Sequence, residues 1–122
     1  MSYDIRLVDK KSGETLYAPF VNESREGTYC MYPGQTRECA FNITYNYYEH
    51  LCKAFNDKRS VRCLYGKTAK ESIPMLEDAI SKLGDDVDPD YWKPTEGNTK
   101  EALNGLLIIA KASDPDGVWE GD

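Results

Sequence analysis

Residues 40–47 alternate between apolar and hydrogen-bonding side chains, with the period of two that is typical of a β-strand. One face carries the apolar side chains of Phe41, Ile43, Tyr45 and Tyr47. The other face carries the uncharged polar side chains of Asn42, Thr44 and Asn46. We expect the first face to pack on a core and the second to offer donors and acceptors to a polar ligand.

The N-terminal half has the pattern of a small antiparallel sheet. Ile5 and Leu7 alternate with polar residues, and the turn-forming run at 9–13 predicts a hairpin with a returning strand at 14–17. A short strand is expected at 27–30, after an irregular polar stretch, and the longest strand at 37–46. These segments together predict a meander.

The C-terminal half has helical periodicity. A short helix is expected at 48–55, and a second one at 74–83, with Pro74 in its first turn and Gly84 after its end. A third helix is expected to begin at Asn98, whose side chain would cap it while Glu101 reaches back. We therefore predict a single α+β domain over residues 1–122, in which a small antiparallel sheet is packed by about three helices.

The composition narrows the choice of partner. The chain has 122 residues, a formal net charge of −6 and a pI near 4.8, which disfavours binding to the phosphates of nucleic acids. No apolar run reaches the roughly 20 residues of a membrane-spanning helix, and the first residues lack the pattern of a secretory signal. We expect a cytoplasmic protein with neither nucleic acid nor a membrane as its partner.

The cysteines do not have the spacing of a metal site. Cys30, Cys39, Cys52 and Cys63 include no C-x-x-C pair, and the expected compartment is reducing, so free buried thiols are predicted. A zinc site that adds His50 would not match the spacing of closed zinc sites. We expect no metal and no other cofactor.

Two short motifs resemble anion or cation sites. The run Gly66-Lys67-Thr68 lacks the second glycine of a phosphate loop, because Val61 stands at that position. We expect a turn into a helix capped by Thr68 or Ser72, from which Lys67 can still contact an anion. The acidic run at 85–90 lacks the glycine and the terminal glutamate of the usual calcium loop, and we expect it to be a solvated loop.

Catalysis has little support in the sequence. His50 is the single histidine, and no carboxylate that could orient it stands nearby. We expect a protein without enzymatic activity. A small hydrolase that uses Cys52 with His50 remains the alternative.

A set of polar and aromatic residues combines fixed hydrogen-bonding groups with flat rings, a mixture that recognises nucleobases, sugars or a peptide edge. The predicted ligand-binding residues are Asn42, Thr44, Asn46, Lys67, Tyr91, Trp92, Asn98 and Trp119. The alternative is that the rings complete a small core and that the asparagines cap turns.

Several motifs, taken together, resemble a group of small bacterial and prophage proteins of unknown function. The likeness covers nearly the whole chain, and its motifs are Asn42-Ile43-Thr44-Tyr45-Asn46-Tyr47, Tyr65-Gly66-Lys67-Thr68, Ser72-Ile73-Pro74, Leu83-Gly84-Asp85-Asp86, Asp90-Tyr91-Trp92, Thr95-Glu96-Gly97-Asn98 and Asp116-Gly117-Val118-Trp119. The resemblance implies a phage or mobile-element origin, and it brings no activity, cofactor or catalytic residue.

Two binding functions follow as hypotheses. The first is an accessory protein that binds a small nucleotide-like or sugar-like ligand and so sequesters a signalling molecule of the host. The alternative is an acidic inhibitor or adaptor that binds a host protein through residues 85–90 and the tryptophans. The sequence leaves open whether the chain forms homo-oligomers.

Overall fold

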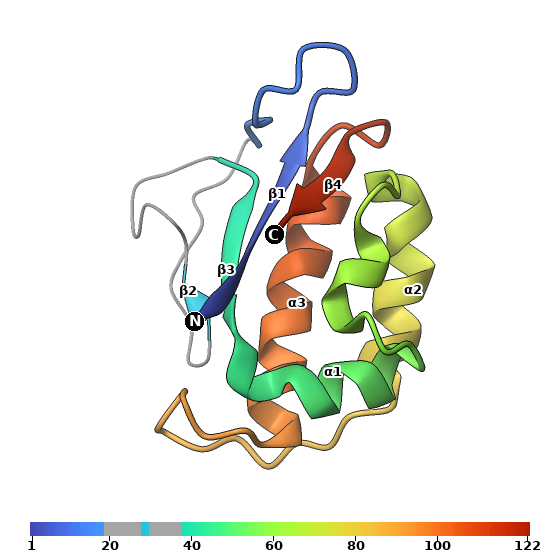
Figure 1. Cartoon of the computed structure of the whole chain (residues 1–122). Coiled ribbons are helices and arrows are strands. Elements are labelled where there is room, and N and C mark those ends of the chain that lie inside the picture. The colour runs from blue at the N-terminus through green and yellow to red at the C-terminus, as the bar shows by residue number, and fades with distance from the viewer. Residues whose placement is uncertain (19–27, 30–37) are drawn as a thin grey trace.

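The computed structural model describes residues 1–18, 28–29 and 38–122, and it confirms the α+β class. Helices pack against one face of an antiparallel sheet (Figure 1). The strands are β1 (Ser2–Val8), β2 (Thr28–Tyr29), β3 (Ala40–Thr44) and β4 (Val118–Gly121). The α-helices are α1 (Tyr48–Phe55), α2 (Ala69–Ser81) and α3 (Glu96–Ala112), and the short 3-10 helices are η1 (Tyr45–Tyr47) and η2 (Ser60–Leu64).

The sheet has the strand order β2-β3-β1-β4, with every pair antiparallel. The last strand, β4, was not expected from the sequence, and it pairs with β1 so that Trp119 stands opposite Leu7. The expected returning strand at 14–17 forms only isolated bridges, one of which joins Val8 to Thr15. These bridges lie on the side of β1 that faces β3, whereas β4, which comes from the other end of the chain, pairs with the opposite edge of β1 (Figure 1).

The strand predicted at 37–46 ends at Thr44, and residue 37 lies outside the described residues. The side-chain oxygen of Thr44 accepts a hydrogen bond from the amide of Asn46, at 3.2 Å, and this bond starts η1. Tyr45 and Tyr47 therefore leave the sheet. The alternation of apolar and polar residues continues through residue 47, but the extended backbone of the strand ends at Thr44.

The first helix matches its prediction, whereas the other two begin earlier than expected. Thr68 and Glu71 form a reciprocal capping box that starts α2, so Pro74 lies inside the helix instead of in its first turn. At α3 the cap is Thr95, whose hydroxyl oxygen accepts a hydrogen bond from the amide of Asn98, at 3.0 Å. The prediction of Asn98 as the cap was wrong, because a threonine three positions earlier takes that role.

The core lies between the sheet and the helices, and α3 comes very close to β3. A Cβ atom on Gly105 of α3 would overlap the ring of Phe41, which is buried. The glycine lowers the intrinsic helix propensity of α3, and the close approach of helix and strand explains why it stands there.

Candidate functional site

Asn42 and Thr44 do not form an open polar face. Only 3% of Asn42 and 4% of Thr44 is exposed. The amide nitrogen Nδ2 of Asn42 donates to Oγ of Ser2, at 2.8 Å, and to the carboxylate of Asp4 on the neighbouring strand. These two residues therefore hold β1 and β3 together and stabilise the turn after β3.

Trp119 is also a structural residue. Its side chain is fully buried, and Nε1 donates to Oγ of Ser72 in α2, at 2.8 Å. Trp119, one of the predicted ligand-binding residues, thus lies in the core, because pairing of β4 with β1 places its ring there. Lys67 is exposed beside it, and its carbonyl oxygen accepts a hydrogen bond from the amide of Trp119, at 2.9 Å.

The remaining predicted residues meet at the segment between α2 and α3, which we call the α2–α3 loop (residues 84–95). It passes below α1 and returns to α3 at the lower edge of the molecule (Figure 1). Three side chains from η1 and α1 reach its carbonyl oxygens. Asn46 donates to Trp92, at 2.8 Å, Tyr47 donates to Tyr91, and Nε2 of His50 lies 2.9 Å from the carbonyl oxygen of Pro94.

The first turn of α3 supports the same loop from the other side. Asn98 is fully buried, and its Oδ1 accepts from the amide of Asp88, at 2.9 Å. Its Nδ2 donates to the carbonyl oxygens of Asp90, at 3.2 Å, and Lys93, at 3.1 Å. One asparagine side chain thus fixes three backbone groups of the loop, which makes it a structural residue of the site.

Gly97 lets the loop lie directly on α3. A Cβ atom at this position would stand 2.5 Å from the amide nitrogen of Val87 and 2.6 Å from the carbonyl carbon of Asp86. The amide of Gly97 also donates to Oδ1 of Asp86, at 3.1 Å. Sequence reasoning missed Gly97, Tyr47 and His50 as supports of the loop. A glycine in the first turn of a helix was the available signal for a close backbone approach.

The charges on the loop are partly compensated. Asp85 pairs with Lys100, at 2.8 Å, and Asp88 pairs with Lys93, at 3.4 Å. A hydrogen bond from the amide of Asp90 is the main reason why the pKa of Asp88 lies below its usual value. Asp86 and Asp90 have no ion-pair partner among the described residues, so they contribute uncompensated negative charge.

The loop exposes apolar surface next to these carboxylates. Trp92 and Val87 are each 47% exposed, although most large apolar side chains of the described residues are buried. The rings of Tyr91 and Trp92 lie 4.5 Å apart between centroids, with a tilt of 41°. The indole therefore has a neighbour that holds it in place, while nearly half of its surface stays open.

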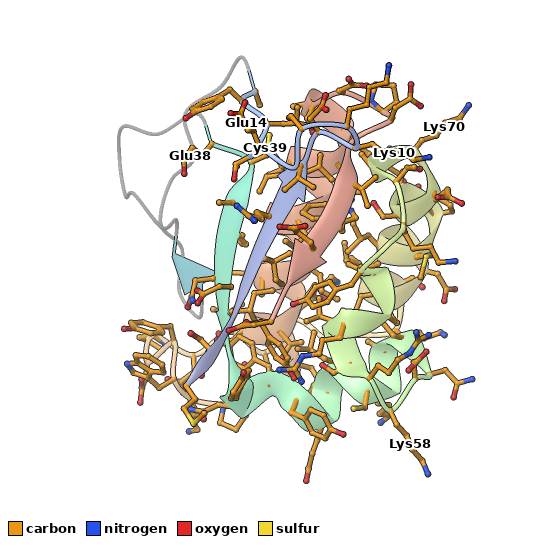
Figure 2. All side chains as sticks on the ribbon, turned by 45° about the horizontal axis from the view of Figure 1, so that its top comes forward. Lys10, Glu14, Glu38, Cys39, Lys58 and Lys70 are labelled. Carbon is orange, nitrogen blue, oxygen red and sulfur yellow. The ribbon has the colours of Figure 1, made fainter. Side chains whose placement is uncertain are left out.

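Positive side chains are spread over the molecule. Lys58 lies at the opposite end from Lys10 and Lys70 (Figure 2), so these lysines do not gather in one patch.

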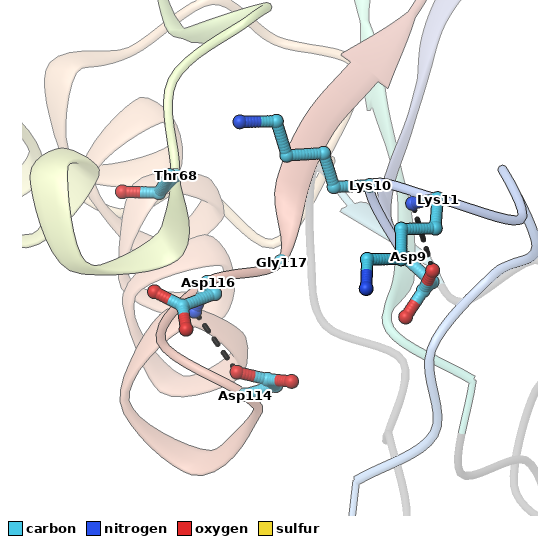
Figure 3. Close-up of a pocket in the computed structure, with 7 residues that line it drawn as sticks. All are labelled: Asp9, Lys10, Lys11, Thr68, Asp114, Asp116 and Gly117. Carbon is cyan, nitrogen blue, oxygen red and sulfur yellow. Dashed lines mark hydrogen bonds between the residues drawn. The ribbon is translucent and has the colours of Figure 1, made fainter.

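A separate hollow of about 450 Å³ lies between the turn after β1 and the turn before β4 (Figure 3). Its lining residues are Asp9, Lys10, Lys11, Thr68, Asp114, Asp116 and Gly117. Asp9 and Asp114 already accept hydrogen bonds from the amides of their own turns, and Thr68 caps α2. The lining mixes both signs of charge and includes none of the predicted ligand residues.

The thiols and the histidine form no catalytic pair in the described part of the chain. Cys39 and Cys63 are buried and free, as expected, and burial raises the pKa of Cys63 to about 11. Cys52 is half-buried with its sulfur 3.7 Å from the carbonyl oxygen of Lys58, whereas Nε2 of His50 faces Pro94. Cys30 lies outside the described residues, and no group able to hold a metal occurs within residues 1–18, 28–29 and 38–122.

No helix in the described ranges is both long enough and apolar enough to cross a bilayer. Comparison with known proteins gives no family model that matches the chain, and no curated protein or solved structure that matches it significantly.

Proposed function

We propose that this chain is a non-enzymatic binding protein that contacts a protein partner through the α2–α3 loop. The exposed indole of Trp92, on a loop whose backbone is fixed from two sides, is the observation that carries the proposal. A loop already held in one conformation loses little entropy on binding. Tryptophan and tyrosine are the residues that most often dominate the binding energy of an interface.

The charge of the loop indicates the kind of partner. Asp86 and Asp90 add negative charge to the loop that carries Trp92, and the whole chain carries −6. Such a surface speeds the approach of a basic protein and repels an acidic one. The resemblance to small prophage proteins favours a protein of a bacterial host as that partner.

A small ligand is the second candidate. Asn46 and Trp92, both predicted to bind a ligand, lie together here, with Nδ2 of Asn46 bound to the carbonyl oxygen of Trp92. A base or a sugar can stack on the exposed indole. A thermal-shift screen with nucleotides, cyclic nucleotides and sugars tests this candidate, because a ligand at about 100 times its Kd stabilises the fold by roughly 2.7 kcal/mol.

Photo-crosslinking tests the protein-binding proposal. The photoreactive amino acid p-benzoylphenylalanine replaces Trp92 in one variant and Ile108 in a control. Ile108 is the matched position, because it is also 47% exposed but lies in the C-terminal half of α3. In a bacterial lysate we expect the probe at 92 to give one dominant adduct that excess unlabelled chain suppresses. Equal adduct patterns at the two positions would contradict the proposal.

A further inference from the structure

Asp90, Tyr91 and Trp92 form an exposed corner of the α2–α3 loop with two different groups that attract cations. Oδ1 of Asp90 accepts the amide hydrogen of Trp92, at 3.1 Å, which places the carboxylate next to the start of the indole side chain. Tyr91 supports the indole, with 4.5 Å between the ring centroids. The electron-rich face of an indole attracts a cation, and so does a carboxylate.

The loop does not supply a cation of its own to this corner. Lys93 is engaged with Asp88, at 3.4 Å, and Lys100 with Asp85, at 2.8 Å. Asp90 has no ion pair with any residue that the structure describes. Asp90 is exposed, and no donor among the described residues binds its second oxygen, Oδ2, so this oxygen is open to a group from outside the chain.

The same chemistry occurs among the described residues, where an arginine meets a pair of tyrosines. The guanidinium of Arg62 lies 4.8 Å from the ring centroid of Tyr3 and 5.6 Å from that of Tyr45. It also donates to the hydroxyl of Tyr45, at 3.1 Å. A planar guanidinium can stack on a ring and donate hydrogen bonds sideways at the same time, which an ammonium group cannot do.

From this corner we infer that the α2–α3 loop binds an arginine side chain of its partner, stacked on Trp92 and hydrogen-bonded to Asp90. The inference rests on the proposed function and specifies its partner as an arginine-bearing segment. The indole sets the plane of the guanidinium, and the carboxylate binds its edge. A metal ion would not bind at this corner in place of the arginine, since the corner provides a single carboxylate.

Tryptophan fluorescence of the full chain provides the test. The chain has two tryptophans, and Trp119 is fully buried, so a ligand that touches the surface alters the emission of Trp92. The probe is an acetylated peptide that alternates glycine with arginine. Two control peptides replace arginine with lysine or with citrulline, which keeps the shape of arginine but lacks its charge.

We expect the arginine peptide to change the emission saturably, with a Kd at least about tenfold below that of the citrulline peptide. The lysine peptide should bind with an intermediate Kd. Asp90→Asn should raise the Kd of the arginine peptide about tenfold, because the amide keeps the acceptor for Trp92 but loses the charge. Asp116→Asn removes an exposed charge elsewhere and should change the Kd less than about twofold.

The inference is overturned if the citrulline peptide binds as tightly as the arginine peptide. It is also overturned if Asp116→Asn weakens binding as much as Asp90→Asn, or if no saturable change appears up to about 10 mM peptide. If the crosslink at position 92 forms but the peptide experiments overturn the inference, the loop still binds a protein and only its specificity for arginine is contradicted. If the crosslink at position 92 and the arginine-dependent binding are both absent, the proposed function is contradicted as well.

Discussion

The amide nitrogen of Val87 lies 2.5 Å from the point where Gly97 would carry a Cβ atom, so the backbone of the α2–α3 loop rests directly on the first turn of α3. No other residue type fits at position 97 without moving the loop. The loop is thus part of the packed structure, and its exposed side chains are presented by a fixed backbone.

Gly97→Ala should therefore destabilise the protein, by about 1–3 kcal/mol, although alanine is the better helix former. The added methyl group meets backbone atoms, which cannot rotate away. Gly84→Ala is the matched control at the other end of the loop, where the nearest atoms are 3.6 Å away, and it should be neutral or slightly stabilising. Urea denaturation of both variants measures the difference, and equal stabilities would contradict the close packing of loop and helix.

Asn98→Ala removes the side chain that binds three backbone groups of the loop. We expect a loss of about 1–3 kcal/mol in the free energy of unfolding, since buried partners are left unpaired. We also expect faster amide hydrogen exchange at Asp88. Asn104→Ala, in a partly exposed position of the same helix, serves as the control and should leave both quantities unchanged. Unchanged exchange in Asn98→Ala would show that this side chain does not hold the loop.

The sequence predicts helices and caps well where the signal lies within a few neighbouring residues. The helix at 48–55 has an apolar face and was placed correctly, and Thr68 was recognised as a possible cap. The predicted start of α2 at Pro74 is wrong, because the capping box of Thr68 with Glu71 begins the helix five residues earlier. Pro74 is the sixth of the 13 residues of α2, so its missing amide removes one hydrogen bond inside the helix.

The candidate site depends on contacts between distant segments, which local patterns do not predict. Trp119 is buried because β4 pairs with β1, from the opposite end of the chain. Asn46 and Trp92 were both named from their chemistry, but their contact joins η1 to the α2–α3 loop. Whether Asn98 serves a ligand or the fold depended on its burial, which only the tertiary structure provides.

Gly105→Ala tests the close approach of α3 to β3. The new methyl group would overlap the ring of Phe41, so we expect a net loss of about 1–3 kcal/mol in stability despite the gain in helix propensity. Phe41→Leu should partly compensate the loss in the double variant, because it removes the atoms in conflict. A double-mutant cycle measured by thermal unfolding gives the coupling energy, and strict additivity of the two changes would contradict the contact.

We expect the α2–α3 loop to become less stable at low pH, where Asp88 is protonated. The pKa of this carboxyl is lowered in the folded state, chiefly by the bond from the amide of Asp90. Its ionised form therefore stabilises the loop above the ordinary value of about 3.9, and the contribution is lost as the pH falls through the folded pKa. Hydrogen exchange at the amide of Asp90, corrected for intrinsic rates, should rise in this range. In Asp88→Asn that rise should disappear, whereas an unaltered rise would assign it to another group.

The binding affinity of Trp92 and Ile108 variants tests the central claim most directly. Both side chains are equally exposed, so their replacement by alanine should leave the melting temperature almost unchanged. For the protein crosslinked at position 92, we predict that Trp92→Ala raises the Kd at least about 30-fold, as expected for a dominant interface residue worth roughly 2 kcal/mol. Ile108→Ala should change the Kd less than about twofold. Similar Kd values for wild type and Trp92→Ala would contradict the claim that this loop is the binding surface.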